Sequence, residues 1–387
     1  MQPQTEKRAA FPESEHRARL ARLRRVLRDE GLDAMVSFSP EHIYYFTGYD
    51  GHTQFSIQSV IVGADDGEAT LILRDVDAIN AEETCWAKDI RYYHHGQHDP
   101  AELIVAAARE RLRSAGVLGT CLNTYALPGA FALHLVDLLG SSRTRDAGAA
   151  IERLRYVKSD LEMTYIRQAA KYADIGLERL RAAAKPGITE IQLTGEIEAA
   201  MREAGSEYPA MPTLLSSGPR TRGSHRTPTD RVIARGDSIK TEFPGIARRY
   251  HAVTMQTLWI GEPGRESRQS YEHALTALRA GSGEIVVGVP VARAELAALE
   301  SLKSAGLDVS RHARFGYGVS AAYPPSWLEG LDITAESTEV FQSNMTFVLH
   351  CMVRTPDGRG ILIGGAYTLG ADGVEVLSGG DLELTVV

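Results

Sequence analysis

Residues 239–257 read IKTEFPGIARRYHAVTMQT and have the pattern of two strands joined by a turn. In the first strand the side chains alternate, so Lys240 and Glu242 share one face. The segment PGIA at 244–247 predicts the turn, and RRYHAVTMQTLWIG at 248–261 predicts the second strand. The strand position alone leaves three interpretations of Glu242 open, namely a metal ligand, a group that reacts without metal, and a solvated surface residue.

The rest of the chain predicts two domains, because 387 residues are too many for one ordinary domain. Over residues 1–155, short apolar runs alternate with helical patterns such as AELIVAAARERLRSA at 101–115, which predicts an α/β domain. Residues 156–387 begin with two long helical segments and continue with short β-like runs between Gly/Pro turns. Ser159 and Glu162 have the spacing of a capping box at the first of these helices. We therefore expect an α+β two-domain protein whose second domain contains a substantial antiparallel sheet.

The composition limits the classes of partner. The chain has 42 Lys and Arg residues against 50 Asp and Glu residues, and the two signs are interspersed, which argues against a nucleic-acid or anionic membrane surface. Cys85, Cys121 and Cys351 have none of the spacings of zinc sites or disulfide frameworks. The sequence shows no signal-peptide pattern and no run of about 18 apolar residues. We expect a cytoplasmic protein that binds a small molecule and neither nucleic acid nor membrane.

The second half resembles the creatinase/methionine-aminopeptidase (M24) superfamily, whose pita-bread catalytic domain follows a smaller N-terminal α/β domain in creatinases and prolidases. In metal-dependent members the hairpin carries two aspartates eleven positions apart, followed by a histidine and two more carboxylates. The corresponding positions here hold Glu242, Val253, Val319, His350 and Gly364. Divalent ions need several convergent ligands, which one carboxylate and one imidazole do not supply. The resemblance thus implies the family scaffold with no metal and no other cofactor.

Two subgroups of this superfamily, creatinase and ectoine hydrolase, hydrolyse non-peptide C–N bonds without metal. The similarity to ectoine hydrolases rests on three segments: YFTGYDG at 45–51, EFPGIARRYHA at 242–252 and YPPSW at 323–327. The segment SSGPRTRGSHRTP at 216–228 places His225 at the position of the superfamily's active-site histidine. The resemblance implies that Glu242 is the nucleophile or general base and that His225 is the proton shuttle. Without it, His225 is interpreted as an ordinary loop residue.

The same resemblance implies seven substrate contacts: Tyr250, His251, Tyr323, Trp327, His350, His52 and Phe55. Each has a structural alternative, such as a histidine bonded within its strand or an aromatic ring in loop packing. His350 replaces the carboxylate that anchors the guanidinium in creatinase, which argues against creatine as substrate. His52 and Phe55 follow YFTGYDG in the loop that reaches the partner subunit's active site in creatinases, so the resemblance also implies a homodimer.

Four functions remain in order of preference. The first is metal-independent hydrolysis of a C–N bond in a small cyclic amidine or related amino-acid derivative. The second is a lyase or cyclising reaction in a specialised pathway that uses the same Glu/His pair, and the third is non-catalytic binding of a small molecule or peptide. A metal-dependent Xaa-Pro dipeptidase comes last because of the missing ligands. The sequence does not identify the substrate, since selectivity depends on distances within the pocket.

Overall fold

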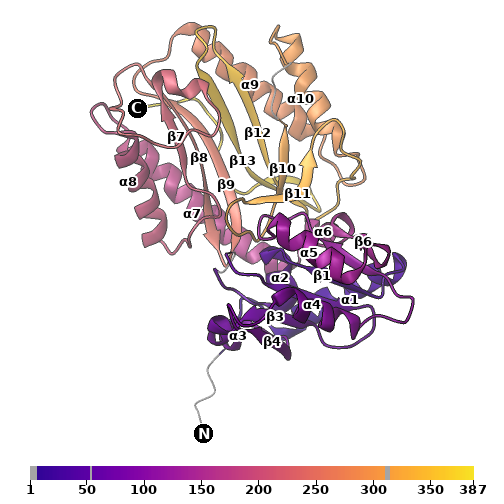
Figure 1. Cartoon of the computed structure of the whole chain (residues 1–387). Helices are drawn as coiled ribbons and strands as arrows, with labels where there is room; N and C mark the ends of the chain where they lie inside the picture. The colour runs from indigo at the N-terminus through magenta and orange to yellow at the C-terminus, as the bar shows by residue number, and fades with distance from the viewer. Residues whose placement is uncertain (1–6, 53–54, 310–313) are drawn as a thin grey trace. The chain divides into compact units, whose positions relative to one another are not determined.

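The computed structural model describes residues 7–52, 55–309 and 314–387 (Figure 1). The chain divides into two compact units, Met1–Arg155 and Tyr156–Val387. The α+β two-domain class expected from the sequence is confirmed, with one sheet in each unit. No helix in the described part of the chain is both long enough and apolar enough to cross a membrane.

The first unit is built around a six-stranded sheet with the strand order β4-β3-β2-β1-β5-β6. Its strands are β1 (Ala34–Ser37), β2 (Ser59–Gly63), β3 (Thr70–Arg74), β4 (Asp89–Tyr93), β5 (Leu118–Cys121) and β6 (Thr144–Asp146). Its helices are α1 (Glu13–Asp29), α2 (Pro40–Thr47), α3 (Ala78–Thr84), α4 (Pro100–Arg109), α5 (Gly129–Leu139) and α6 (Gly148–Tyr156). Alternation along β1 places Met35 in one apolar cluster and Val36 in another, so both faces of this sheet are covered.

The second unit contains a nine-stranded sheet in which β11-β10-β12-β13-β9-β8-β7 are neighbours, with β14 on β13 and β15 on β9. The strands are β7 (Leu214–Ser217), β8 (Ser238–Ala247), β9 (Tyr250–Trp259), β10 (Gly316–Val319), β11 (Leu328–Ile333), β12 (Thr346–Arg354), β13 (Gly360–Gly370), β14 (Gly373–Val376) and β15 (Thr385–Val386). The helices are α7 (Asp160–Ala183), α8 (Glu190–Glu203), the 3-10 helix η3 (Gly218–Arg222), α9 (Arg265–Gly283) and α10 (Ala292–Ser304). Helix α7 packs on β8 and β9, and α9 packs on β12 and β13 (Figure 1).

The turn predicted at 244–247 is wrong. Strands β8 and β9 pair through this segment, and the chain turns instead at Arg248 and Arg249, whose φ angles are 49° and 69°. Two consecutive positive φ angles are those of the type I′ turn that joins two-residue hairpins. A Cβ added to Gly245 would lie 2.0 Å from the carbonyl oxygen of Ala169 in α7. This glycine therefore permits close packing of a helix on the strand and does not mark a turn.

The predicted capping box at the start of α7 is confirmed. The Ser159 hydroxyl accepts a bond from the Glu162 backbone N–H at 3.3 Å, and the Glu162 carboxylate accepts one from the Ser159 N–H at 2.9 Å. The other Glu162 oxygen accepts a hydrogen bond from the Tyr250 hydroxyl at 2.8 Å. The cap therefore also ties the helix to the β8–β9 hairpin that carries Glu242.

Candidate active site

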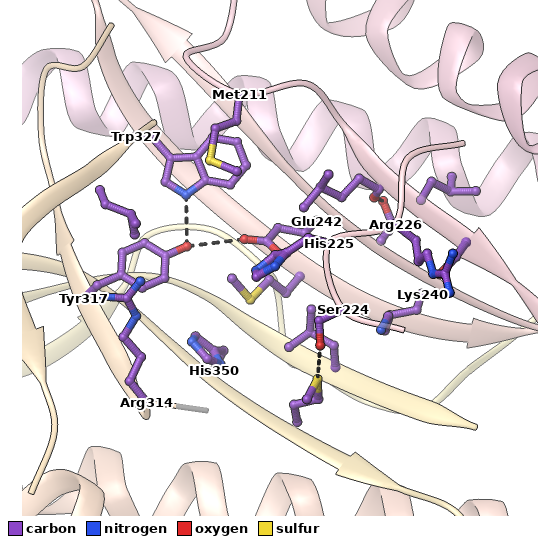
Figure 2. Close-up of a pocket in the computed structure, with 18 residues that line it drawn as sticks. Met211, Ser224, His225, Arg226, Lys240, Glu242, Arg314, Tyr317, Trp327 and His350 are labelled. Carbon is purple, nitrogen blue, oxygen red and sulfur yellow. Dashed lines mark hydrogen bonds between the residues drawn. The ribbon is translucent and has the colours of Figure 1, made fainter. Parts of the chain in front are cut away.

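A cavity of about 270 Å³ lies within the second unit, and Figure 2 shows the side chains that line it. The apolar part of its lining includes Met211, Leu214, Met255, Trp327 and Leu362. The titratable groups that line it are His225, Lys240, Glu242, Arg314, Tyr317 and His350, with Arg226 beside them. An apolar pocket with a few convergent polar groups is the usual form of a small-molecule site.

Glu242 carries the only carboxylate among the described residues that line this cavity. It lies in the middle of β8, between Leu214 of β7 and Met255 of β9 in the register of the sheet. Desolvation by burial raises the pKa of Glu242 to about 7, against the opposing effects of the Tyr317 hydrogen bond and of the charges of Lys240 and Arg314. A carboxyl group with this pKa exchanges its proton near neutral pH, as a general base or a nucleophile requires.

Tyr317 makes the direct contact with this carboxylate. Its hydroxyl donates a hydrogen bond to Glu242 Oε1 at 3.4 Å and accepts one from Trp327 Nε1 at 3.0 Å (Figure 2). Burial, followed by the negative charge of Glu242, raises the pKa of Tyr317 well above its usual range. The tyrosine therefore stays protonated and keeps a proton available for the carboxylate.

Lys240 lies on the same strand face as Glu242 and holds the loop that carries His225. Its ammonium donates to the carbonyl oxygens of Thr221 and Gly223 at 2.7 Å and 2.6 Å. Burial lowers the pKa of Lys240 to about 8, although the charge of Glu242 acts in the opposite direction. Two carbonyl acceptors fix the loop by charge-assisted hydrogen bonds, which are stronger than neutral ones.

His225 follows in this loop with a φ of 49°, is exposed, and lines the cavity that Glu242 also lines. The structure thus brings together the two residues predicted to be catalytic. An exposed imidazole at the wall of a pocket can exchange protons with solvent, which suits a shuttle. Trp327 and His350, two of the seven predicted substrate contacts, line the same cavity.

Two predicted substrate contacts, Tyr250 and His251, do not line the cavity. The Tyr250 hydroxyl is bonded to Glu162, as described above. His251 Nε2 accepts a hydrogen bond from the Ala210 N–H at 3.1 Å, and its Nδ1 lies 2.7 Å from the Arg249 carbonyl oxygen. Burial lowers the pKa of His251 to about 4, so the ring is neutral and donates from Nδ1. The polar atoms of both side chains serve the fold, so the geometry does not support a role in substrate binding.

Tyr323 is also buried, with 1% of its surface exposed, and does not line the cavity. His52 and Phe55 lie in the first unit, where Phe55 is exposed over 78% of its surface. The contact of these two residues with a partner subunit stays a prediction.

The residues around Glu242 do not fit a divalent metal ion. Val253 and Val319 belong to an apolar cluster together with Met255 and Leu362. A Cβ added to Gly364 would lie 2.2 Å from the Leu349 carbonyl oxygen, so a carboxylate cannot be placed there without a shift of the strand. The described residues contain no group of three or more His, Cys, Asp or Glu side chains arranged for a metal. Divalent ions require more oxygen and nitrogen donors than this site offers.

Comparison with known proteins identifies the family. Residues 164–374 match metallopeptidase family M24, and residues 19–157 match the creatinase/prolidase N-terminal domain. The chain belongs to family M24. It is 27% identical over 355 residues to the ectoine hydrolase of Halomonas elongata, and the aligned region covers 87% of this chain and 88% of that protein. The superfamily resemblance drawn from the sequence is thereby confirmed.

Solved M24 structures share the fold of this chain. The dipeptidase PepE of Mycobacterium ulcerans superimposes with a TM-score of 0.85 at 24% identity, covering 97% of this chain and 99% of that chain. A prolidase from Thermococcus sibiricus gives a TM-score of 0.86 at 19% identity, and the superposition covers 96% of this chain and 99% of the prolidase chain. At these identities the likeness extends to the fold alone, and the activity of this M24 protein has to be argued from its own side chains.

Three residues that line the cavity, Tyr317, Lys240 and Arg314, are not predicted as site residues from the sequence. The alternation in SIKTEF already places Lys240 on the face of Glu242, so that signal was present. Tyr317 lies two positions before Val319 and therefore on the same face of β10, but no pattern distinguishes it from a packing tyrosine. The Arg314 guanidinium lies 5.1 Å from the ring centre of Tyr317 and pairs with Asp332. Its place in the pocket depends on the fold of β10 and β11.

Proposed function

We propose that this M24 protein hydrolyses a C–N bond of a small cyclic amidine without metal, with Glu242 as nucleophile or general base and His225 as proton shuttle. The observation that carries the proposal is one carboxylate with a raised pKa in a mostly apolar cavity whose other charged groups are cations and imidazoles. Ectoine, a cyclic amidine that also carries a carboxylate, is the first substrate to test.

The electrostatics of the cavity suit an amidinium ion. A cation bound beside Glu242 stabilises the ionised carboxylate, so substrate binding lowers the pKa of Glu242 and generates the reactive form. Trp327 lies in the wall of the cavity, and an aromatic ring beside the pocket suits a planar cation. Arg226 and Arg314 line the same cavity and suit the carboxylate of a zwitterionic substrate.

The proposed reaction consumes one water. An oxygen of Glu242 bonds to the carbon between the two ring nitrogens, and the π electrons of the C=N bond move to nitrogen. His225 transfers a proton to the leaving nitrogen, and that C–N bond breaks. Water then adds to the same carbon, gives a proton to His225, and the bond to Glu242 breaks. The product is an N-acyl diamine, and both side chains return to their starting states.

The known relatives support the reaction class more than the substrate. The Halomonas elongata relative is named ectoine hydrolase, and the identity of 27% leaves room for another amidine. The M24 dipeptidases and prolidases share the scaffold, but the ligand positions around Glu242 do not fit a metal.

We also propose a homodimer in which His52 and Phe55 reach the partner's cavity. A cytoplasmic location is supported by the three buried, free cysteines.

Mass spectrometry of protein quenched during incubation with ectoine tests the proposal. We expect the peptide that contains Glu242 to gain the mass of one ectoine molecule, and a Glu242→Gln variant to show no gain. Glu262→Gln, which alters an exposed carboxylate, serves as the matched control and is expected to behave as the wild type. Ligand binding without adduct or turnover would identify a non-catalytic member. A product other than the N-acyl diamine would favour the lyase or cyclase.

A further inference from the structure

We propose that Tyr317 is a positioning residue for Glu242, held in a one-way hydrogen-bond relay that runs from Trp327 through Tyr317 to the carboxylate. The role of the relay in catalysis rests on the proposed function, in which Glu242 is the reacting group. Its geometry stands independently of the substrate. Tyr317 is 3% exposed and Trp327 is 1% exposed, so water does not compete for the bond between them.

The direction of the relay follows from the donors and acceptors. An indole N–H can only donate, so at 3.0 Å from the hydroxyl oxygen of Tyr317 it must occupy a lone pair of that oxygen. The hydroxyl has a single proton, and its remaining neighbour is Glu242 Oε1 at 3.4 Å. Trp327 thus directs the Tyr317 proton to the carboxylate (Figure 2).

The relay distinguishes the two carboxylate oxygens. Oε1 accepts from Tyr317, whereas Oε2 makes no hydrogen bond with any described residue. Oε2 is therefore the oxygen available to the amidine carbon, whereas Oε1 faces the Tyr317 hydroxyl at 3.4 Å. A donor to the ionised form also favours ionisation and opposes the effect of burial on the pKa of Glu242.

Other charged or titratable groups, Arg226 among them, line the cavity together with Glu242, but none of the described ones is hydrogen-bonded to its carboxylate. Lys240 of β8 is bonded to two loop carbonyls, and Arg314 before β10 pairs with Asp332. Both cations lower the pKa of Glu242 by charge without a hydrogen bond to it in this structure. The imidazoles of His225 and His350 line the same cavity, from the loop after η3 and from β12. Tyr317 thus makes the one direct hydrogen bond to the Glu242 carboxylate among the described residues.

A titration without substrate tests the relay. The protonated carboxyl stretch of Glu242 is followed by infrared spectroscopy as a function of pH, with Glu242→Gln as the subtraction. We expect the pKa of Glu242 to rise by about 1 in Tyr317→Phe, a tenfold change in its ionisation constant, and by less in Trp327→Phe. Tyr271→Phe is the matched control, since it also removes a buried tyrosine hydroxyl that donates to a carbonyl at 2.9 Å, remote from the cavity. An unchanged titration in Tyr317→Phe would overturn the relay.

Kinetics then test the positioning role. With ectoine as substrate, we expect the acidic limb of the kcat/KM profile to move to higher pH in Tyr317→Phe and kcat to fall about tenfold or more, with the profile of Tyr271→Phe unchanged. If the pKa of Glu242 from the infrared titration rises in Tyr317→Phe but the acidic limb of the kcat/KM profile stays at the same pH, the positioning role is overturned. Absence of turnover in the wild type would contradict the proposed function, and the titration would still decide the relay.

Discussion

Replacing Glu242 with glutamine is expected to stabilise the folded protein, and to do so increasingly as the pH rises. A carboxyl group whose pKa is higher in the folded than in the unfolded state holds its proton more tightly when folded. Between the two pKa values the unfolded chain has lost this proton and the folded chain has kept it, so wild-type stability falls with rising pH. Glutamine does not titrate, and it retains an oxygen that can accept from Tyr317.

The magnitude follows from the environment of the carboxylate. Burial raises its pKa from 4.5 to about 7, and a difference of about 2.5 corresponds to about 3 kcal/mol of unfolding free energy. Part of the Glu242 side chain remains accessible from the cavity, so water screens some of this cost. We therefore expect the unfolding free energy of Glu242→Gln to exceed that of the wild type by about 2 kcal/mol above pH 7 and to be almost the same near pH 4.

Urea unfolding at a series of pH values measures this difference. Tryptophan fluorescence reports on the second unit through Trp259 and Trp327 and on the first unit through Trp86, and circular dichroism provides an independent probe. Glu262→Gln, which alters an exposed carboxylate that pairs with Arg268, is the control and is expected to show no comparable gain in unfolding free energy above pH 7. A gain in Glu242→Gln that does not depend on pH would refute the assignment of a buried carboxyl with a raised pKa.

Further changes have separate expected outcomes. His225→Ala is expected to lower kcat about 100-fold and to leave the melting temperature unchanged, since the side chain is exposed; a normal kcat would exclude the shuttle. Lys240→Met removes the donor to two loop carbonyls, so we expect faster amide hydrogen exchange in the His225 loop and a lower kcat; unchanged exchange would contradict this. Gly245→Ala is expected to lower the unfolding free energy by about 3 kcal/mol, because its Cβ would collide with the Ala169 carbonyl; denaturant unfolding measures the loss. Dialysis against a chelator is expected to leave ectoine turnover unchanged, and loss of activity restored by Mn²⁺ would favour a metalloenzyme.

The sequence predicted those features that depend on local periodicity. Alternation in SIKTEF placed Glu242 and Lys240 on one face, and the Ser159 and Glu162 spacing predicted the cap that the structure contains. The turn was misplaced because Pro-Gly is a strong local signal, whereas two arginines at positive φ carry almost none. The packing of α7 against Gly245 is a tertiary constraint that no local pattern contains.

The candidate site was predictable only in part, because its geometry depends on residues distant in sequence. Glu242 and Tyr317 are separated by 75 positions and meet through the order of the strands in the sheet. His251 lies by alternation on the same face as Met255, yet a backbone N–H and a carbonyl occupy its two nitrogens. Residue type and periodicity indicate which side chains face inward, but not which polar atoms are already bonded.

Family membership leaves the chemistry open, because the same M24 scaffold carries side chains with different functions. A dipeptidase and a prolidase superimpose closely on this chain. The positions at which the superfamily resemblance leads us to expect metal ligands hold Val253, Val319 and Gly364 here. The structure shows that these positions are filled by apolar packing or by close backbone contact. The donors that remain around the cavity therefore decide which reactions are feasible.

The most direct test of the account is the rate of ectoine ring opening by wild-type protein stripped of metal, compared with Glu242→Gln under the same conditions. Product is followed by proton NMR, and metal content is measured on the same samples. We predict turnover by the metal-free wild type and a loss of at least about 1000-fold in Glu242→Gln. Turnover that persists in Glu242→Gln, or that appears only when a divalent ion is added, would contradict the claim that this carboxylate carries the reaction without metal.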